Sequence, residues 1–585
     1  MMIDTFFEKF DLFANAPNLV SKMRELVLQL AVQGKLAQQD QRDESACELV
    51  KRARKLTLAD PRLAKIVKAH DDGRQGEINA LADLPTGWAW TCNAELGDTS
   101  PRNNADDDSV VAFAPMNRVP TDYRAQLEFE SRPWREIRKG FTHFANGDVA
   151  VAKITPCFQN GKACVMANLT GGVGAGTTEL HVLRPHPNTV VPLYALLFFK
   201  SPEFVAGGVA TFSGTAGQQR VSNDYFRFRP VPLPPLAEQK RIVAKVDELM
   251  ALCDRLEEQL QERETRHAAL ARASLARFAD APTPANLPFL FHPSYAIAPA
   301  NLRKSILTLA VQGKLVPQDP NDEPAEELVT RVAREKLRLL QAKEIKSETP
   351  LDPISDEEVF PIPDSWIWLR AGDLCRPISS GSTPDQSIFH ASEGVPYLKV
   401  YNIRNQSVDF DYKRQFIAAS HHEERMKRSI LRPGDVIMNI VGPPLGKVAI
   451  VPDTFPEWNC NQAISFFRPI FPEFAPYLYT FLKEDSFLQK IQLIGTAGQD
   501  NISVTKCKFI PIPIPPLAEQ RRIVAKVEQL MALVDALETQ LAASRATAAN
   551  LLSALVAELT RVALPLKNPP QAGLKKSKRS AISLR

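Results

Sequence analysis

The chain has 585 residues, 44% of them hydrophobic, so it is long enough for several domains that each bury a core. Its formal net charge of +4 is too small to demand a polyanionic partner, although clustered basic residues would permit one. No run approaches the roughly 20 apolar residues of a membrane span, and Asp4 stands where a signal peptide carries basic residues. We therefore expect a cytoplasmic protein that does not bind membranes.

A helical stretch at 26–54 is the first predicted element, and it contains a hexapeptide that occurs twice. AVQGKL stands at 31–36 and again at 310–315, within a second helical stretch at 306–334. A Gln-Asp pair breaks each stretch near its middle. Because the period is far longer than that of any solenoid repeat, the pattern predicts a duplicated pair of domains.

A segment rich in short β-like runs follows each helical stretch; we call these segments the first and second modules. The first module opens at Trp88 and Trp90 and closes at a proline run at 231–235, and its runs at 147–154 and 162–166 predict paired strands. The tryptophans are expected to anchor the core. The matching landmarks of the second module are Trp366 and Trp368, the proline run at 512–516, and the runs at 434–441 and 447–451.

A nearly identical helix follows each module. Residues 234–260 and 515–541 share 21 of 27 positions, and their apolar residues step by four and three, as in a heptad seam. A first helix that continued to residue 279 would be roughly 65 Å long. We expect the two seams to pack on each other; the alternative is that each seam covers its own domain. The seams consist of Ile242, Val246, Leu249, Cys253, Leu256 and Leu260, and of Ile523, Val527, Leu530, Val534, Leu537 and Leu541.

These elements predict an α+β protein with two α/β modules, separated by two long antiparallel coiled-coil helices and related by a pseudo-two-fold internal repeat. Prolines at 279–300 indicate a connector between the two copies. The expected parts are an N-terminal helical region at 1–84, the first module at 85–235, a central helical region at 236–359, the second module at 360–516, a C-terminal long helix at 517–562 and a basic, disordered tail at 563–585.

The two copies of the repeat are more similar in their helices than in their modules, and this difference suggests a function. The helices are nearly identical, whereas the modules agree only in scattered short stretches. A duplicated scaffold with two unlike modules suits a ligand whose two halves have different sequences. The alternative is a duplication whose loops simply changed faster.

A search for catalytic motifs finds none that is complete. The glycine-rich segment at 442–448 is too short for a phosphate loop and ends in valine, and the segment at 171–176 lacks the features of a dinucleotide site. The cluster at 421–424 (HHEE) is absent from the first half and is interpreted as a solvated polar turn. The eight cysteines never fall at C-x-x-C spacing, so we expect buried thiols and neither metal sites nor disulfides. We expect no enzymatic activity.

The sequence resembles the specificity subunit of type I restriction-modification systems over nearly its whole length. The resemblance rests on the paired AVQGKL segments, the paired PPLAEQ helix starts, the Gly-Asp-Val strands and GSTP at 381–384. The first module departs from the last motif, with GDTSP at 97–101, so residue equivalences near that loop are in doubt.

The resemblance implies two target recognition domains, each reading one half of a bipartite site in double-stranded DNA. It also implies helical regions that dock two methyltransferase subunits, and restriction/translocase subunits in the larger complex. S-adenosylmethionine, ATP and magnesium would belong to those partners, with no cofactor in this chain. The alternative function is a coiled-coil adaptor whose two modules bind proteins.

Residues that distinguish two half-sites must differ between the modules, whereas shared residues serve the scaffold or phosphates. The shared segment GTAGQ, at 214–218 and 495–499, fits backbone contact or an ordinary turn. Arg can pair with guanine, and Asn or Gln with adenine. The candidate DNA-binding residues of the first module are Arg102, Asn117, Arg118, Lys153, Gln159, Asn160, Gln218, Gln219 and Arg220. Those of the second module are Ser382, Thr383, Lys399, Asn402, Arg404, Asn405, Asn439, Lys447, Gln499, Asp500 and Asn501.

Overall fold

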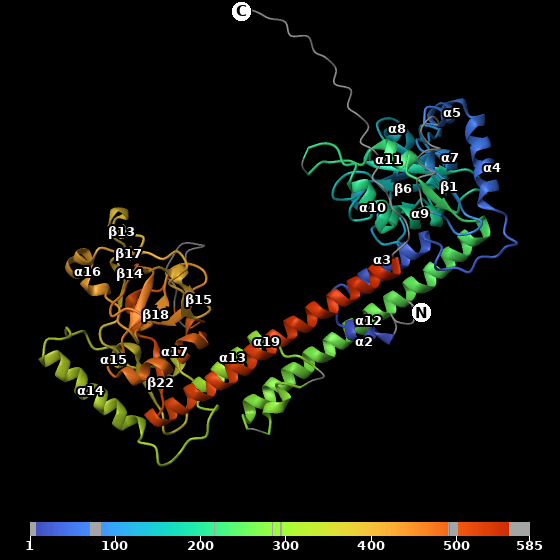
Figure 1. Cartoon of the computed structure of the whole chain (residues 1–585). Coiled ribbons are helices and arrows are strands. Elements are labelled where there is room, and N and C mark those ends of the chain that lie inside the picture. The colour runs from blue at the N-terminus through green and yellow to red at the C-terminus, as the bar shows by residue number, and fades with distance from the viewer. Residues whose placement is uncertain are drawn as a thin grey trace, which may run out of the picture. The chain divides into compact units, whose positions relative to one another are not determined.

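The computed structural model describes residues 8–70, 83–215, 217–283, 285–292, 295–489, 491 and 501–560. The chain divides into two compact units, Met1–Glu262 with Ala543–Arg585, and Arg263–Ala542. Each unit holds one module, the helices that precede it and parts of the two longest helices (Figure 1). The basic tail at 563–585 lies outside the described residues.

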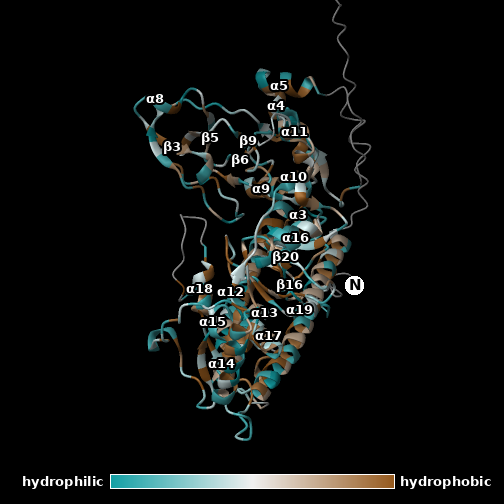
Figure 2. Ribbon diagram, turned by 90° about the vertical axis from the view of Figure 1, so that its left-hand side faces the viewer, coloured by the Kyte–Doolittle hydropathy of each residue, from teal (hydrophilic) through white to brown (hydrophobic). Residues whose placement is uncertain are grey.

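The N-terminal helices of both units confirm the predicted helical stretches and their breaks. In the first unit they are α2 (Phe10–Phe13), α3 (Leu19–Val32), α4 (Ala46–Ala59) and α5 (Pro61–Lys68). In the second unit they are α13 (Pro299–Val311) and α14 (Ala325–Gln341). Both hydrophilic and hydrophobic residues occur along α14 (Figure 2), and its buried residues include Leu328, Val332 and Leu339.

The repeated hexapeptide ends α3 and α13, and its glycine is required there. Gly34 and Gly313 have φ values of 69° and 71°, a conformation that side chains disfavour. A Cβ atom on Gly34 would lie 2.7 Å from Cγ of Pro85, and one on Gly313 would lie 2.5 Å from Cγ of Pro363. The motif therefore turns the chain back against a proline that lies three residues before the first tryptophan of each module.

The first module contains two four-stranded sheets, ordered β2-β9-β6-β7 and β4-β3-β8-β5. Its strands are β1 (Ala89–Thr91), β2 (Gly97–Asp98), β3 (Val110–Ala114), β4 (Glu130–Pro133), β5 (Thr142–Ala145), β6 (Val149–Ala152), β7 (Ala163–Val165), β8 (Val173–Gly176), β9 (Leu180–Pro185) and β10 (Val231–Leu233). Its helices are α7 (Asn93–Leu96), α8 (Trp134–Ile137), α9 (Pro192–Lys200), α10 (Pro202–Val209) and α11 (Asn223–Phe228).

The second module also contains two four-stranded sheets, ordered β12-β21-β18-β19 and β13-β17-β14-β20, and an additional hairpin of β15 and β16. Its strands are β11 (Ile367–Arg370), β12 (Ser379–Ser380), β13 (Phe389–His390), β14 (Val395–Leu398), β15 (Ile403–Arg404), β16 (Ser407–Val408), β17 (Phe416–Ile417), β18 (Val436–Asn439), β19 (Val448–Ile450), β20 (Asn459–Cys460), β21 (Ile464–Phe467) and β22 (Pro511–Ile514). Its helices are α15 (Ala371–Leu374), α16 (Ala419–Arg425), α17 (Ala475–Glu484) and α18 (Val504–Lys508).

The predicted strand pairs are confirmed in both modules. β6 pairs antiparallel with β7, and β18 pairs antiparallel with β19. The start and end of each module also meet, because Trp90 in β1 faces Pro232 in β10, and Trp368 in β11 faces Pro513 in β22. Each module is thus closed by a short sheet that joins its first strand to its last.

The longest helices are α12 (Leu236–Asp280) and α19 (Leu517–Thr560). The first part of each heptad seam packs on its own module: Ile242 and Val246 belong to the core of the first module, and Ile523 and Val527 to that of the second. The expectation that the two seams cover each other is therefore wrong for these parts. A period of 3.5 residues selects a helix face but does not say what packs against it.

Both long helices continue beyond their own module. In the first unit, Leu256 and Leu260 of α12 pack on a cluster that includes Leu552 and Leu555 of α19. In the second unit, Leu275 of α12 packs on the cluster that contains the early part of α19. Each unit thus contains segments of both helices.

Each unit also contains the same ion pair, between its N-terminal helix and one of the long helices. Arg24 on α3 pairs with Asp254 at 2.8 Å, and Arg303 on α13 pairs with Asp535 at 2.6 Å. Among the described residues, no helix is long and apolar enough to cross a bilayer.

Candidate nucleic-acid interface

In the first module, backbone hydrogen bonds join two segments that are far apart in the sequence. Three of the predicted DNA-binding residues lie on these segments. The backbone of Ile154 is bridged to that of Arg220. The N–H of Thr155 donates to the carbonyl of Gln219 at 2.9 Å, and the N–H of Val221 donates to the carbonyl of Lys153, also at 2.9 Å. The loop after β6 and the segment after GTAGQ thus bring together Lys153, Gln219 and Arg220.

The second module builds the same backbone arrangement. Val441, just after β18, is bridged to Asn501, and the N–H of Ile502 donates to the carbonyl of Ile440 at 2.9 Å. We call the two arrangements the paired-loop frames; they comprise residues 153–155 with 219–221, and 440–441 with 501–502. Gln499 and Asp500 lie outside the described residues.

Arg220 is held by an acidic residue that the sequence did not single out. Its Nε and Nη2 donate to the two carboxylate oxygens of Glu179, each at 2.8 Å, and its Nη1 donates to the carbonyl of Gln218 at 3.0 Å. The guanidinium lowers the pKa of Glu179. The Arg220 side chain remains 41% exposed, so it can still meet a ligand.

Gln159 and Asn160 lie on the turn that follows the first frame, at the edge of a cavity of about 510 Å³. Lys200 lies in the same cavity and donates from Nζ to the carbonyls of Thr121 at 2.8 Å and Gly161 at 2.6 Å. Burial lowers the pKa of Lys200 to about 8. Gln159 and Asn160 are exposed, so they are open to a ligand.

The remaining candidates of the first module lie on other segments. Arg102 follows β2, and Asn117 and Arg118 lie between β3 and β4 of the second sheet. All three are exposed, and Arg118 pairs with Glu128 at 3.2 Å.

The structure corrects the prediction for Asn402 and Asn439, each of which is only 1% exposed. Asn402 accepts from the N–H of Lys399 at 2.9 Å and donates to the carbonyl of Tyr412 at 2.8 Å. Asn439 accepts from the N–H of Lys447 at 2.6 Å and donates to the carbonyl of Pro444 at 2.9 Å. Because these amides satisfy loop backbone groups inside the module, they shape the surface and do not meet bases.

Arg404 and Asn405 lie at the turn of the β15–β16 hairpin. Asn405 and Gln406 have φ values of 49° and 59°, as a two-residue hairpin turn requires. The N–H of Val448 donates to the side chain of Gln406 at 2.7 Å, which places the hairpin next to Lys447. Arg404, Asn405 and Lys447 therefore lie on one part of the second module, beside its paired-loop frame.

Aromatic rings accompany the cations of this region. The guanidinium of Arg404 lies 4.2 Å from the ring centroid of Tyr412, and Nζ of Lys399 lies 4.7 Å from that of Phe389. Tyr412 is 39% exposed. The sequence did not single it out, although a tyrosine near basic residues is a familiar feature of nucleic-acid surfaces.

The GSTP loop is fixed by a close backbone approach. A Cβ atom on Gly381 would lie 2.1 Å from the carbonyl oxygen of Cys460, so only glycine fits. The hydroxyl of Tyr397 donates a hydrogen bond to the carbonyl of Ser382 at 2.7 Å, and the hydroxyl of Thr383 donates one to the side-chain carbonyl of Gln462. Thr383 is exposed at the rim of the module.

The HHEE cluster is not the solvated turn that the sequence suggested. His422 lies in α16 and is 2% exposed, with Nε2 3.2 Å from Glu457 and Nδ1 3.1 Å from Asn459. Among the residues that the structure describes, no group of three or more His, Cys, Asp or Glu could hold a metal ion.

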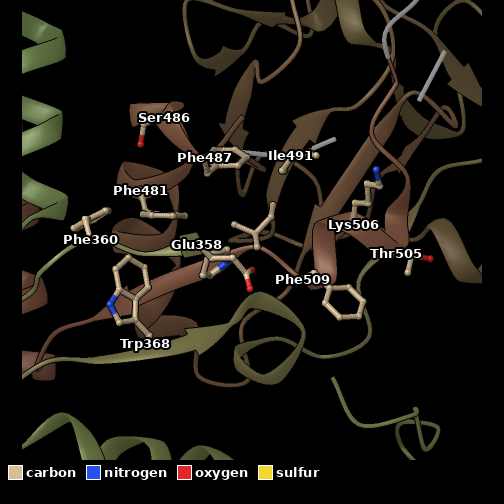
Figure 3. Close-up of a pocket in the computed structure, with 12 residues that line it drawn as sticks. Glu358, Phe360, Trp368, Phe481, Ser486, Phe487, Ile491, Thr505, Lys506 and Phe509 are labelled. Carbon is tan, nitrogen blue, oxygen red and sulfur yellow. The ribbon is translucent and has the colours of Figure 1, made fainter. Parts of the chain in front are cut away.

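A mostly apolar cavity of about 440 Å³ lies in the second module beside β11 and β22 (Figure 3). Trp368, Phe360, Phe481 and Phe487 line it. Because the lining is mostly apolar, we place the candidate interface on the paired-loop frames and not in this cavity.

Two modules with a common backbone frame and unlike polar side chains define a recognition protein with two binding heads. The family model described as "Type I restriction modification DNA specificity domain" matches residues 94–263 and 363–544. The chain belongs to this type I restriction-modification DNA specificity family. Its function is DNA sequence recognition through two such domains, and it is a non-catalytic subunit.

Relatives match over almost their entire length. The EcoAI specificity subunit of Escherichia coli is 35% identical over 94% of both chains. The EcoEI specificity subunit of the same species is also 35% identical, again over 94% of both. A solved HsdS subunit from Thermoanaerobacter tengcongensis is 19% identical, with a TM-score of 0.44, covering 82% of this chain and 98% of that one.

Proposed function

We propose that each module reads one half of a bipartite site in double-stranded DNA through its paired-loop frame. The observation that carries this proposal is that the frames share their backbone bonds but differ in their side chains, with Arg220 in one where Asn501 stands in the other. Common bonds fix the approach to DNA, and differing side chains select the bases.

The residues proposed for base contact are those that lie on or beside the frames and are at least partly exposed. They are Lys153, Gln159, Asn160, Gln218, Gln219 and Arg220 in the first module, and Arg404, Asn405, Lys447 and Asn501 in the second. Arg102, Asn117, Arg118, Ser382, Thr383 and Lys399 stay proposals for contacts outside the frames, together with Gln499 and Asp500.

We further propose that α12 and α19 form an antiparallel spacer that relates the modules by a pseudo-two-fold axis. The helices enter the two units in opposite order, since α12 begins in the first unit and α19 in the second. The sequence predicted long helices that begin at 236 and 517 and continue to about 279 and 562, and α12 and α19 span Leu236–Asp280 and Leu517–Thr560. An antiparallel arrangement would present both frames to a single duplex.

The repeated helices are the proposed docking sites for two methyltransferase subunits. Leu252 on α12 and Leu533 on α19 occupy corresponding positions in the repeat and are 44% and 45% exposed. Two copies of one apolar position suit two copies of one partner. S-adenosylmethionine, ATP and magnesium would then be bound by the methyltransferase and restriction/translocase subunits. The adaptor alternative is set aside because the matched family is a DNA specificity family.

The test is a genome-wide map of N6-methyladenine in the source organism, with and without this chain. The proposal predicts one bipartite motif, with two short defined halves around an undefined spacer, that loses methylation when the chain is removed. Retention of every methylated motif, or loss of a continuous motif without a spacer, would refute it.

A further inference from the structure

Glu179 and Arg220 form a bidentate ion pair at the edge of the first frame. The Arg220 side chain is 41% exposed and that of Glu179 is 22% exposed. We propose that Glu179 is a positioning residue that aims Arg220 at a guanine in the half-site of the first module. This inference rests on the proposed function and assigns one base of that site.

The hydrogen bonds of Arg220 leave two of its N–H groups unused. A guanidinium has five N–H groups. Nε and Nη2 each donate to Glu179, and Nη1 donates to the carbonyl of Gln218. One N–H on each terminal nitrogen is not used by these bonds. Guanine presents two acceptors, O6 and N7, side by side in the major groove, and an arginine binds both.

The second module shows that this pair is exchanged as a unit. The N–H of Lys153 donates to the carbonyl of Glu179 at 2.9 Å, and the N–H of Ile440 donates to the carbonyl of Ala463 at 2.8 Å. With the frame contacts, this bond makes Ala463 the counterpart of Glu179. Where the first module has Glu179 and Arg220, the second has Ala463 and Asn501. Asparagine pairs with adenine and needs no acidic support.

A carboxylate next to DNA repels the phosphates and so weakens overall binding. This repulsion distinguishes a residue that positions Arg220 from one that contributes to phosphate binding. Glu179 carries a negative charge close to where phosphates would lie, and phosphate contacts dominate overall affinity. Removing Glu179 should therefore leave affinity for non-specific DNA unchanged or higher, while weakening the choice of base. A residue that only stabilised the fold would reduce both.

The experiment uses the full chain, purified from its host with the subunits that accompany it. The probe is a library of duplexes in which each position of the methylated motif is randomised, selected at low and high salt. The variants are Glu179→Ala, Glu179→Asp, Arg220→Ala, Arg220→Lys and the double variant Glu179→Ala with Arg220→Asn. Random duplex without the motif measures non-specific affinity.

The unmodified protein is expected to prefer guanine at one position of one half-site. Arg220→Ala should lose that preference by about 5- to 150-fold, the range for one bidentate base contact. Arg220→Lys should not restore it, because a lysine lacks the two parallel donors. Glu179→Ala should lose a large part of it with non-specific affinity kept, and Glu179→Asp should regain some. The double variant should prefer adenine at the same position.

The outcomes distinguish a failure of this inference from a failure of the proposed function. If Arg220→Ala changes base preference and Glu179→Ala does not, Glu179 has no positioning role. If Arg220→Ala changes no position, the guanine assignment is wrong although the modules still read DNA. If the unmodified protein shows no base preference within the motif, the proposed function itself fails.

Discussion

The indole Nε1 of Trp88 donates a 3.1 Å hydrogen bond to the carboxylate of Glu238, the third residue of α12. Trp366 makes the same bond, at 3.0 Å, to Glu519 at the start of α19. All four residues are at least nine-tenths buried. The bond joins the first residues of each module to the helix that follows it, so the repeat preserves the attachment of a module to its long helix.

We predict that Trp366→Phe destabilises the second unit by about 1–3 kcal/mol, because it leaves a buried carboxylate oxygen without its donor. Urea unfolding followed by circular dichroism measures this change. Trp134→Phe is the matched control: Trp134 is also buried and packs on the ring of His143, 4.9 Å away. Equal losses in the two variants would mean that ring packing, and not the bond to Glu519, accounts for the effect.

His181 should make the stability of the first module depend on pH. Burial lowers its pKa from the usual 6.5 to about 4. Between these values the unfolded chain binds a proton that the folded chain excludes, so stability falls as the pH drops through this window, by at most about 3 kcal/mol. His181→Phe, which can keep the stacking on Phe226, should flatten this dependence. Parallel urea curves for both proteins across the window would contradict the assignment.

Shortening both long helices should shorten the undefined spacer of the DNA site. The heptads at 249–255 and 530–536 would be the natural choice from sequence, but Met250 and Leu530 belong to module cores. Residues 261–267 and 541–547 lie beyond those cores and are mostly exposed. Removing seven residues from each helix takes away about 10 Å, or about three base pairs.

Mapping of methylated sites reads out the spacer directly. Deletion of the seven residues from α12 alone is the control. It should abolish methylation because the two helices would then differ in length. A double deletion that methylates sites with the original spacer would contradict a spacing role for these helices.

Leu252→Glu and Leu533→Glu should each remove one methyltransferase subunit from the complex. Each change places a charge on an apolar contact, and we expect at least about tenfold weaker docking at that site. Native mass spectrometry of the purified complex counts the subunits. Gln259→Glu, an exposed change further along α12, is the control. Two bound subunits in both leucine variants would place docking elsewhere.

Local patterns in the sequence predicted the local structure well. Alternating apolar runs bounded by glycine gave the β6–β7 and β18–β19 pairs, and the heptads gave two long helices. The predicted packing partner of each seam was wrong for its first part, which includes Ile242 and Ile523. A heptad pattern looks the same whether it faces a module or another helix.

The candidate site was harder to predict than the fold. Asn402 and Asn439 have the chemistry of base readers, but residue type does not reveal that they are buried. Glu179 was missed because it lies 41 residues from Arg220, and only the folded module brings them together. The segment after GTAGQ was found because it is where the two copies begin to differ.

The most direct test of independent half-site reading is an exchange of one module. Residues 88–235 would be replaced by the corresponding segment of the EcoAI specificity subunit, and the methylated motif of the hybrid complex would be sequenced. One half of the motif should change while the other half stays the same. A hybrid in which both halves change, or neither does, would contradict independent reading.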